Sequence, residues 1–153
     1  MSLTRRLLGL LACLSLCWSL LAAELPAWNW RPTLIPRALL LEGLWTDTFR
    51  LREACHLAGL PYGAAYRSTS PYWRPNARLI GMPPIREALS QYSVIVLSNV
   101  DAPVIGAERL AWLRDFVQAG GGLVVLAGHW AYGHGGYLGT PLAEMLPVTF
   151  EPD

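Results

Sequence analysis

Short apolar runs alternate along the chain with segments of helical spacing. The runs at residues 94–97 and 123–126 are unbroken and rich in valine, isoleucine and leucine. Such runs are typical of strands that are buried on both faces of a parallel sheet. Two earlier and less uniform runs predict strands at residues 37–41 and 62–67, and a further strand is expected to begin at residues 148–150.

Residues 107–119 predict the longest helix, because their apolar side chains recur at helical spacing. Four of these side chains share one stripe: Leu110, Leu113, Phe116 and Val117. Three glycines follow at residues 120–122, where a helix commonly ends in the left-handed conformation that glycine adopts without strain. Together with the strands on either side, this helix forms a unit typical of a right-handed βαβ crossover.

Shorter elements fill the remaining intervals. Residues 48–58 predict a helix that ends at a glycine, and residues 85–91 and 140–146 predict two short helices that begin next to proline. Residues 68–82 are expected to form an irregular loop. The alternation of strands with helices predicts an α/β fold.

The amino-terminal residues have the pattern of an export signal. Arg5 and Arg6 precede an apolar run at residues 7–23 that contains no charge. This run predicts either a cleaved signal peptide at residues 1–23 or an uncleaved signal-anchor, with a lipoprotein box at residues 10–13 as a third alternative. In each case we expect the following domain to be exported, either periplasmic or anchored to the membrane through residues 7–23. Residues 24–36, with two tryptophans and three prolines, predict a linker to a domain at residues 37–153.

Composition and charge exclude several classes of function. The chain has 153 residues, a hydrophobic content of 53% and a net charge of +1, which excludes disorder and gives no electrostatic case for nucleic-acid binding. All 12 basic residues are arginine, so lysine chemistry is excluded. Cys13 and Cys17 lie in the leader, which leaves Cys55 alone in the domain without a partner for a disulfide or a cysteine metal cluster. We expect neither a metal nor a cofactor.

The glycine-rich segment after the last buried strand carries most of the candidate site. In open parallel sheets, ligands bind beyond the carboxyl ends of the strands, and this segment leaves such an end. Glycine lets backbone approach a ligand, while imidazole and aromatic rings supply contacts. Trp45 and Asp101 follow the first and third strands and are expected at the same edge. The predicted ligand-binding residues in the segment itself are Gly128, His129, Trp130, Tyr132, Gly135 and Gly136.

These segments resemble a known family. The patterns ALLLEGLWTDTFRLREACHLA and VIVLSNVDAP…LRDFVQAGGGLVVLAGHWAYGHGGYLGTPLAEMLPV are similar to the class I glutamine amidotransferase-like superfamily. They are most similar to its branch of non-catalytic amidotransferase-like domains from bacterial envelope proteins, over residues 37–148. The resemblance implies a flavodoxin-like three-layer sandwich with a mainly parallel central sheet, in the strand order second, first, third, fourth. Because the resembling domains continue with further strands, it leaves open a truncation at the carboxyl end.

The chemistry of that family requires a cysteine on the tight turn after the fourth strand, activated by a later histidine and glutamate. Here the turn reads Gly128-His129-Trp130, and no histidine follows His134. Cys55 lies in the first helix and is expected to be a small buried hydrophobe. We therefore predict that the chain does not hydrolyse glutamine, and that it is an exported module that binds a ligand or a partner protein.

Two alternatives remain open at the level of sequence. One is a hydrolase or a carbohydrate-modifying enzyme that uses Glu42, His129 and Asp101, and the other is a membrane-tethered scaffold that docks an envelope protein. A zinc site at His129 and His134 is less favoured than a hydrogen bond from His129 to backbone with His134 exposed. The aromatic residues either stack on a sugar or peptide or cover loops: Trp45, Tyr66, Tyr72, Trp73, Trp130, Tyr132 and Tyr137.

Overall fold

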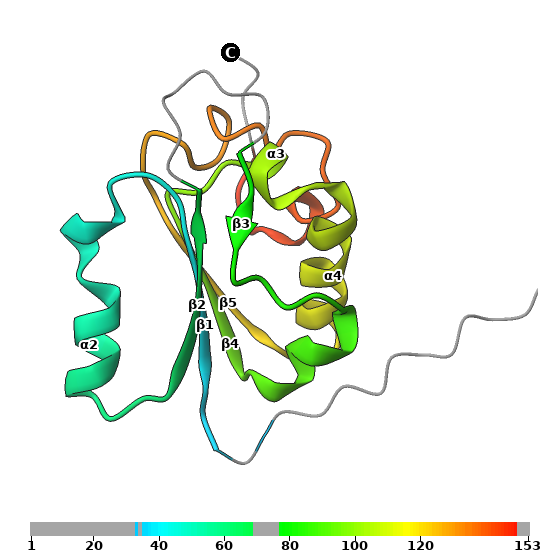
Figure 1. Cartoon of the computed structure of the whole chain (residues 1–153). Coiled ribbons are helices and arrows are strands. Elements are labelled where there is room, and N and C mark those ends of the chain that lie inside the picture. Colours follow the sequence, from blue (N-terminus) through cyan, green and yellow to red (C-terminus); the bar gives the residue numbers. More distant parts are fainter. Residues whose placement is uncertain (1–32, 34, 69–76, 150–153) are drawn as a thin grey trace, which may run out of the picture.

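The computed structural model describes residues 33, 35–68 and 77–149 (Figure 1). The predicted signal or anchor at residues 1–23, most of the linker at residues 24–36, and Tyr72, Trp73 and Phe150 lie outside these described residues. Within the described ranges, no helix has the length and apolar character needed to cross a membrane.

Five strands form one mostly parallel, mixed sheet in the order β3-β2-β1-β4-β5. The parallel strands are β1 (Ala38–Glu42), β2 (Tyr62–Arg67), β4 (Val94–Ser98) and β5 (Gly122–Leu126). The sheet confirms the α/β fold. The order of the parallel strands, β2-β1-β4-β5, is the predicted order of second, first, third and fourth strand. One prediction was wrong here, because residues 68–82 contain β3 (Leu79–Ile80), which pairs with β2 in the antiparallel direction.

The helices follow the sequence pattern less closely than the strands do. The helix predicted at residues 107–119 is α4 (Ala107–Gln118), whereas the short α3 (Ala102–Ile105) was not predicted. The helix predicted at residues 48–58 is divided into a 3₁₀ turn, η1 (Thr46–Phe49), and α2 (Leu51–Leu57). The division occurs at Arg50, whose φ of 48° lies in the left-handed region that a right-handed helix cannot continue through.

Of the other short elements, the helix predicted at residues 85–91 is present as a 3₁₀ helix, whereas the remaining predictions are corrected. Residues 85–91 form a 3₁₀ helix, η2 (Arg86–Gln91), and residues 140–146 contain only a 3₁₀ turn, η3 (Ala143–Met145). Val148 and Thr149 are not in a strand. A 3₁₀ helix suits such short connections because it needs only a few residues to close its hydrogen bonds.

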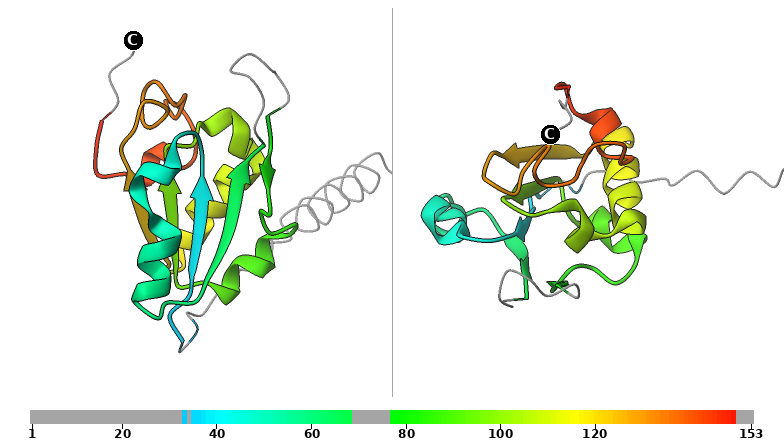
Figure 2. Two further views of the ribbon diagram at one scale, coloured as in Figure 1. Left: turned by 60° about the vertical axis from the view of Figure 1, so that its left-hand side comes forward. Right: turned by 90° about the horizontal axis from the view of Figure 1, so that it is seen from above.

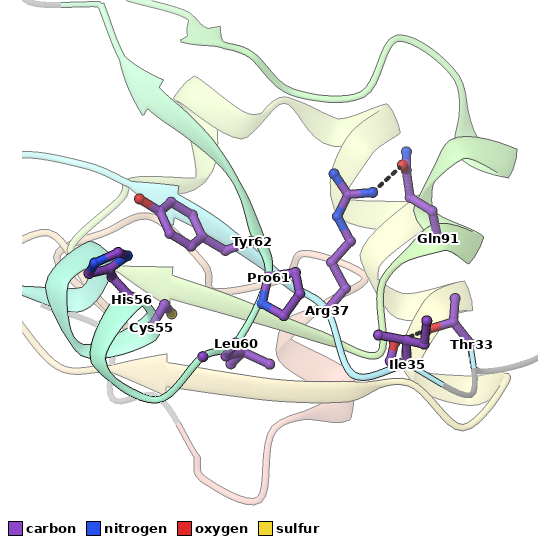
Figure 3. Close-up of a pocket in the computed structure, with 10 residues that line it drawn as sticks. Thr33, Ile35, Arg37, Cys55, His56, Leu60, Pro61, Tyr62 and Gln91 are labelled. Carbon is purple, nitrogen blue, oxygen red and sulfur yellow. Dashed lines mark hydrogen bonds between the residues drawn. The ribbon is translucent and has the colours of Figure 1, made fainter.

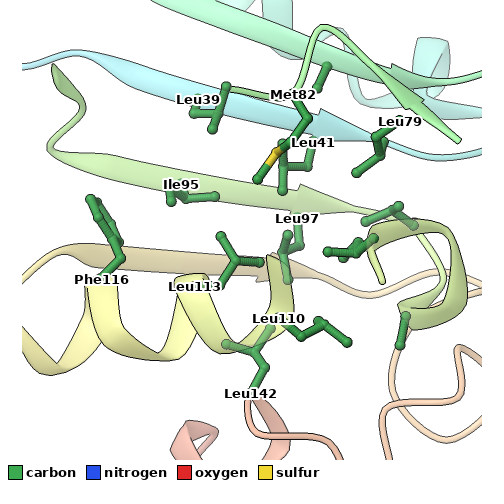
Figure 4. Close-up of a cluster of buried hydrophobic side chains, with 14 of the residues drawn as sticks. Leu39, Leu41, Leu79, Met82, Ile95, Leu97, Leu110, Leu113, Phe116 and Leu142 are labelled. Atoms are coloured by element: carbon green, nitrogen blue, oxygen red, sulfur yellow. The ribbon is translucent and has the colours of Figure 1, made fainter. Parts of the chain in front are cut away.

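One face of the sheet packs against α4 to form the hydrophobic core (Figure 4). Side chains alternate along a strand, so Leu39 and Leu41 of β1 and Ile95 and Leu97 of β4 point to this same face. The predicted stripe of α4 meets them with three fully buried side chains, whereas Val117 is only partly buried. Those three side chains are Leu110, Leu113 and Phe116.

The other face of the sheet is covered less completely. Helix α2 lies on this side, opposite α3 and α4 (Figures 1 and 2). None of the residues of α2 is buried, and Val124 of β5 remains 42% exposed. Loose packing of one short helix leaves room at both of its ends, and residues of α2 line a cavity at each end.

Candidate functional site

A cavity of about 500 Å³ lies at the carboxyl ends of β1 and β2, under the start of α2. We call it the carboxyl-edge cavity. Glu42 and Tyr66 are partners in the register of β1 and β2, so the parallel pairing brings both side chains to this edge. The residues that line it are Glu42, Gly43, Leu44, Trp45, Thr46, Asp47, Arg50, Leu51, Arg52, Glu53, Tyr66 and Arg67.

The floor of this cavity holds an ion pair between Glu42 and Arg52. The Glu42 side chain is 8% exposed, and its two oxygens accept hydrogen bonds from the Arg52 Nε at 3.1 and 2.9 Å. The Arg52 Nη2 donates a further bond to the same carboxylate. These hydrogen bonds raise the pKa of Arg52 above its usual value. Because a fork of donors meets both carboxylate oxygens, Glu42 is oriented as well as neutralised.

Two aromatic rings stand at the same cavity with large exposed fractions. Trp45 is 54% exposed and Tyr66 is 45% exposed. Trp45 has a φ of 54°, in the left-handed region, and immediately precedes η1. Large rings of this exposure beside a fixed carboxylate and guanidinium are a common combination in sites that hold polar ligands.

Asn99 organises this edge, and the sequence analysis missed it. It follows β4, is 4% exposed and has a φ of 45°. Its Nδ2 donates a hydrogen bond to the Leu44 carbonyl at 2.6 Å, and its Oδ1 accepts one from the Trp130 N–H at 2.7 Å. One buried amide therefore joins the loops that follow β1, β4 and β5. The available signal was an asparagine directly after a buried strand, since asparagine tolerates the left-handed region.

Two glycines are required by the position of Asn99. A Cβ added to Gly43 would lie 1.7 Å from the Asn99 carbonyl oxygen, and one added to Gly128 would lie 2.4 Å from the Asn99 Oδ1. Both distances are far below any normal contact. The absence of a side chain at Gly128 therefore allows the Asn99 side chain to lie against it. This is a role within the protein, in addition to the ligand contact predicted for Gly128.

The glycine-rich segment is held against the start of α3. The Ala102 N–H donates to the Gly135 carbonyl at 2.7 Å, and the Tyr137 hydroxyl donates to the Val100 carbonyl at 2.7 Å. Tyr137 is only 3% exposed, so it is a core residue. Its burial, with a smaller contribution from the charge of Asp101, raises the pKa of its hydroxyl well above the usual range. Gly136, in contrast, is exposed, with a φ of 70°.

Several buried polar atoms at this edge have no hydrogen-bond partner among the described residues. Arg67 Nε lies 3.6 Å from Asp101 Oδ1, which is too long for a hydrogen bond, and neither atom has another partner. Ser98 Oγ and Trp130 Nε1 are unpaired in the same way. Buried polar atoms are nearly always paired, so four unpaired atoms at the ends of β2, β4 and β5 are unusual, and of these four residues only Arg67 lines the carboxyl-edge cavity.

The two histidines of the glycine-rich segment lie apart from the Glu42 carboxylate. His129 and His134 are exposed and stack with ring centroids 5.6 Å apart, and His129 also meets the edge of Trp130 at 4.9 Å. His129 is outside the carboxyl-edge cavity, and among the described residues its side chain makes neither the predicted hydrogen bond to backbone nor one to Glu42. Among the described residues, no three acidic, histidine or cysteine side chains are grouped to hold a metal ion.

Cys55 corrects another expectation. It was predicted to be a buried hydrophobe, but it is partly exposed on α2 and lines a second cavity at the opposite end of the sheet, together with His56. No hydrogen bond joins the two side chains. Consecutive positions on a helix point in different directions, so the imidazole of His56 is not placed to act as the base of this thiol.

The carboxyl edge thus combines a neutralised carboxylate, exposed rings and unpaired buried polar atoms. Within the described residues, it has no thiol or hydroxyl nucleophile paired with a base. Comparisons of the chain with models of protein families, with curated proteins and with solved structures found no match.

Proposed function

We propose that this chain is a glutamine amidotransferase-like domain that lacks the cysteine nucleophile and binds a ligand at the carboxyl edge of its sheet. The sequence patterns of residues 38–58 and 94–148 support the assignment to this superfamily. The four parallel strands and the helices on both sides of the sheet are consistent with its flavodoxin-like three-layer architecture.

The observation that carries the proposal is the packing of Gly128 against Asn99. In the resembling family, the turn after this strand presents the nucleophilic cysteine. Here a side chain at Gly128 would collide with the Asn99 Oδ1 at 2.4 Å, and the next residue, His129, is exposed and outside the cavity. The turn therefore takes part in the contacts that hold three loops together, and it does not present a thiol.

The class of ligand that this edge fits best is a carbohydrate. Trp45 and Tyr66 offer exposed ring faces on which the apolar face of a sugar can stack. Glu42 and Arg52 between them supply acceptors and donors for hydroxyl groups, as does the unpaired Nε of Arg67, which also lines the cavity. A cavity of about 500 Å³ is within the range of small-molecule sites, which is about 300–1,000 Å³.

The proposed location is outside the cytoplasm. The apolar run at residues 7–23, preceded by Arg5 and Arg6, supports export, with the domain either periplasmic or tethered to the membrane. In that location, the ligand would be a soluble sugar or a glycan of the cell envelope, or the edge would be covered by an envelope protein. Mass spectrometry of the protein from isolated membranes and from the periplasm would identify its amino terminus and separate the cleaved from the retained leader.

The function is tested by titrating the purified full-length chain with a panel of mono- and oligosaccharides while tryptophan fluorescence is recorded. We expect one class of sugar to bind and the Trp45→Ala variant to weaken that binding by about tenfold, as the loss of one stacking ring predicts. Phe49→Ala is the matched control, because Phe49 is also exposed, at 39%, but does not line the cavity. Equal effects of the two variants, or no binding of any sugar, would contradict the proposal.

A further inference from the structure

The second cavity lies at the amino ends of β1, β2 and β4, at the opposite end of the sheet from the carboxyl edge (Figure 3). Its volume is about 730 Å³, within the range of small-molecule sites. Arg37 enters it from the residue before β1, Gln91 from the end of η2, and Cys55 from α2. We call it the amino-edge cavity.

Arg37 is a cation without a counter-charge in this cavity. No carboxylate of the described residues lies within ion-pair distance of it, whereas Arg50, Arg52, Arg67, Arg86 and Arg114 each have one. The Arg37 Nη1 donates to the neutral Gln91 Oε1 at 3.1 Å, and the guanidinium lies over the Tyr92 ring at 5.2 Å. Both contacts fix the orientation of the group without neutralising its charge.

The Arg37 side chain also carries a buried polar atom without a partner. Its Nε is the only such atom of the described residues that does not belong to the carboxyl edge. A partly buried guanidinium stays charged at every physiological pH, so desolvation is costly until an anion lies close to it. Arg37 is therefore poised to hold a carboxylate or a phosphate.

The rest of the lining is apolar or neutral. Ile35, Leu60, Pro61 and the ring of Tyr62 contribute hydrocarbon surface, and Ile35 is 69% exposed. The lining residues in the described part of the chain include no aspartate or glutamate, which separates this cavity from the carboxyl edge with its Glu42, Asp47 and Glu53. An anion would meet no repulsion here, and a hydrocarbon tail would find a surface to cover.

We propose that the amino-edge cavity is a second binding site, which takes an amphiphilic anion through Arg37 and the apolar lining. The ligand class is a carboxylate or phosphate on a short hydrocarbon chain, as in a free fatty acid or in the acidic part of a phospholipid. This inference rests on a different cavity from the carbohydrate site and stands or fails independently of it.

Cys55 provides a direct reporter, because it lines the same cavity as Arg37 and is partly exposed. The full-length chain is treated with iodoacetamide with and without octanoate, and the alkylation of each cysteine is followed by mass spectrometry of separate peptides. At an octanoate concentration about ten times its Kd, alkylation of Cys55 is expected to be about tenfold slower. Cys13 and Cys17 serve as internal references in the same sample.

Variants and matched compounds separate the anion from the tail. Arg37→Gln should remove the protection by octanoate, whereas Arg109→Gln should preserve it, because Arg109 also lacks an ion pair in the described residues but lies outside the cavity. Octan-1-ol should protect far less than octanoate. Octyl phosphate and inorganic phosphate are tested in the same way. Stronger protection of Cys55 by octyl phosphate than by octanoate would indicate a lipid phosphate as the ligand, and the reverse would indicate a free carboxylate.

Several outcomes would overturn the proposal. If octan-1-ol protected Cys55 as well as octanoate does, Arg37 would not be the anchor of an anion. If inorganic phosphate protected it as well as octyl phosphate does, the hydrocarbon chain would not contribute to binding. Slower alkylation of all three cysteines would show a general effect of the amphiphile. As a second readout, octanoate should raise the Tm of the wild-type chain but not the Tm of the Arg37→Gln variant. If octanoate changed neither Tm, binding would be refuted, even if Cys55 reacted too slowly with iodoacetamide to report on it.

Discussion

The side-chain oxygen of Asn99 accepts a hydrogen bond from the backbone N–H of Trp130 at 2.7 Å, across the ends of β4 and β5. The nitrogen of the same amide donates to the Leu44 carbonyl, on the other side of β4. Asn99 therefore sets the relative positions of the loop that carries Trp45 and the loop that carries His129. This one buried amide thereby joins the loops that form the carboxyl edge.

We expect the Asn99→Gly variant to lower the free energy of unfolding by about 1–3 kcal/mol, because two hydrogen bonds are lost while their partners stay partly buried. Glycine adopts the observed φ of 45° without strain, so this variant isolates the contribution of the amide. Urea unfolding followed by circular dichroism measures the difference.

Asn99→Ala should be less stable than Asn99→Gly by about 1 kcal/mol, because the left-handed conformation is strained for alanine but not for glycine. Asn99→Asp should also be destabilised, because a carboxylate cannot donate to the Leu44 carbonyl. If alanine proved as stable as glycine, the left-handed backbone at this position would be wrong.

The ion pair of Glu42 and Arg52 predicts an asymmetry between its two partners. Removing Arg52 leaves a carboxylate that is 8% exposed without its counter-charge, whereas removing the charge of Glu42 leaves a guanidinium that is 50% exposed and readily hydrated. We expect Arg52→Ala to lower the free energy of unfolding by about 2 kcal/mol or more, and Glu42→Gln by about 1 kcal/mol or less. Urea unfolding of both variants at neutral pH checks the order, and a larger loss for Glu42→Gln would contradict the burial of the carboxylate.

The strands and α4 were predictable because their signals are local. An unbroken apolar run at residues 94–97 and a helical stripe ending in three glycines need no knowledge of the rest of the chain. The resemblance then implied the order of the parallel strands, and the observed pairing of β2, β1, β4 and β5 confirms it. The division of the first helix at Arg50 was not predictable, since a positive φ at arginine leaves no mark in the sequence.

The site was predicted in part for the same reason. Glu42 and Trp45 reach a cavity because they follow a strand, as the rule for parallel sheets requires. Asn99 and Arg37 were missed because each owes its importance to residues far away in sequence. Asn99 bonds to Leu44 and Trp130, while Arg37 bonds to Gln91 and has no carboxylate of the described residues within ion-pair distance. Such partners become visible only when the chain is folded.

The purified full-length chain is expected to release no ammonia from glutamine above the uncatalysed background. The turn after β5 carries no cysteine, and Cys55 lies at the other end of the sheet without a hydrogen bond to His56. A coupled glutamate dehydrogenase assay measures the release, with Cys55→Ala as the control variant. Activity that disappears in Cys55→Ala would identify a nucleophile in the amino-edge cavity and would refute the proposed function.

Tyr137 predicts a loss of stability at alkaline pH. Burial, together with the nearby charge of Asp101, raises the pKa of its hydroxyl in the folded state above the value of about 10 for an unfolded tyrosine. Above that value the unfolded chain releases a proton that the folded chain retains, so the free energy of unfolding should fall by up to about 1.4 kcal/mol per pH unit. Tyr137→Phe should lose about 1 kcal/mol at neutral pH, with its bond to the Val100 carbonyl, but should show a flatter decline above pH 10. Urea unfolding of both proteins between pH 8 and pH 11 decides, because parallel curves would mean that this hydroxyl is not the group that titrates.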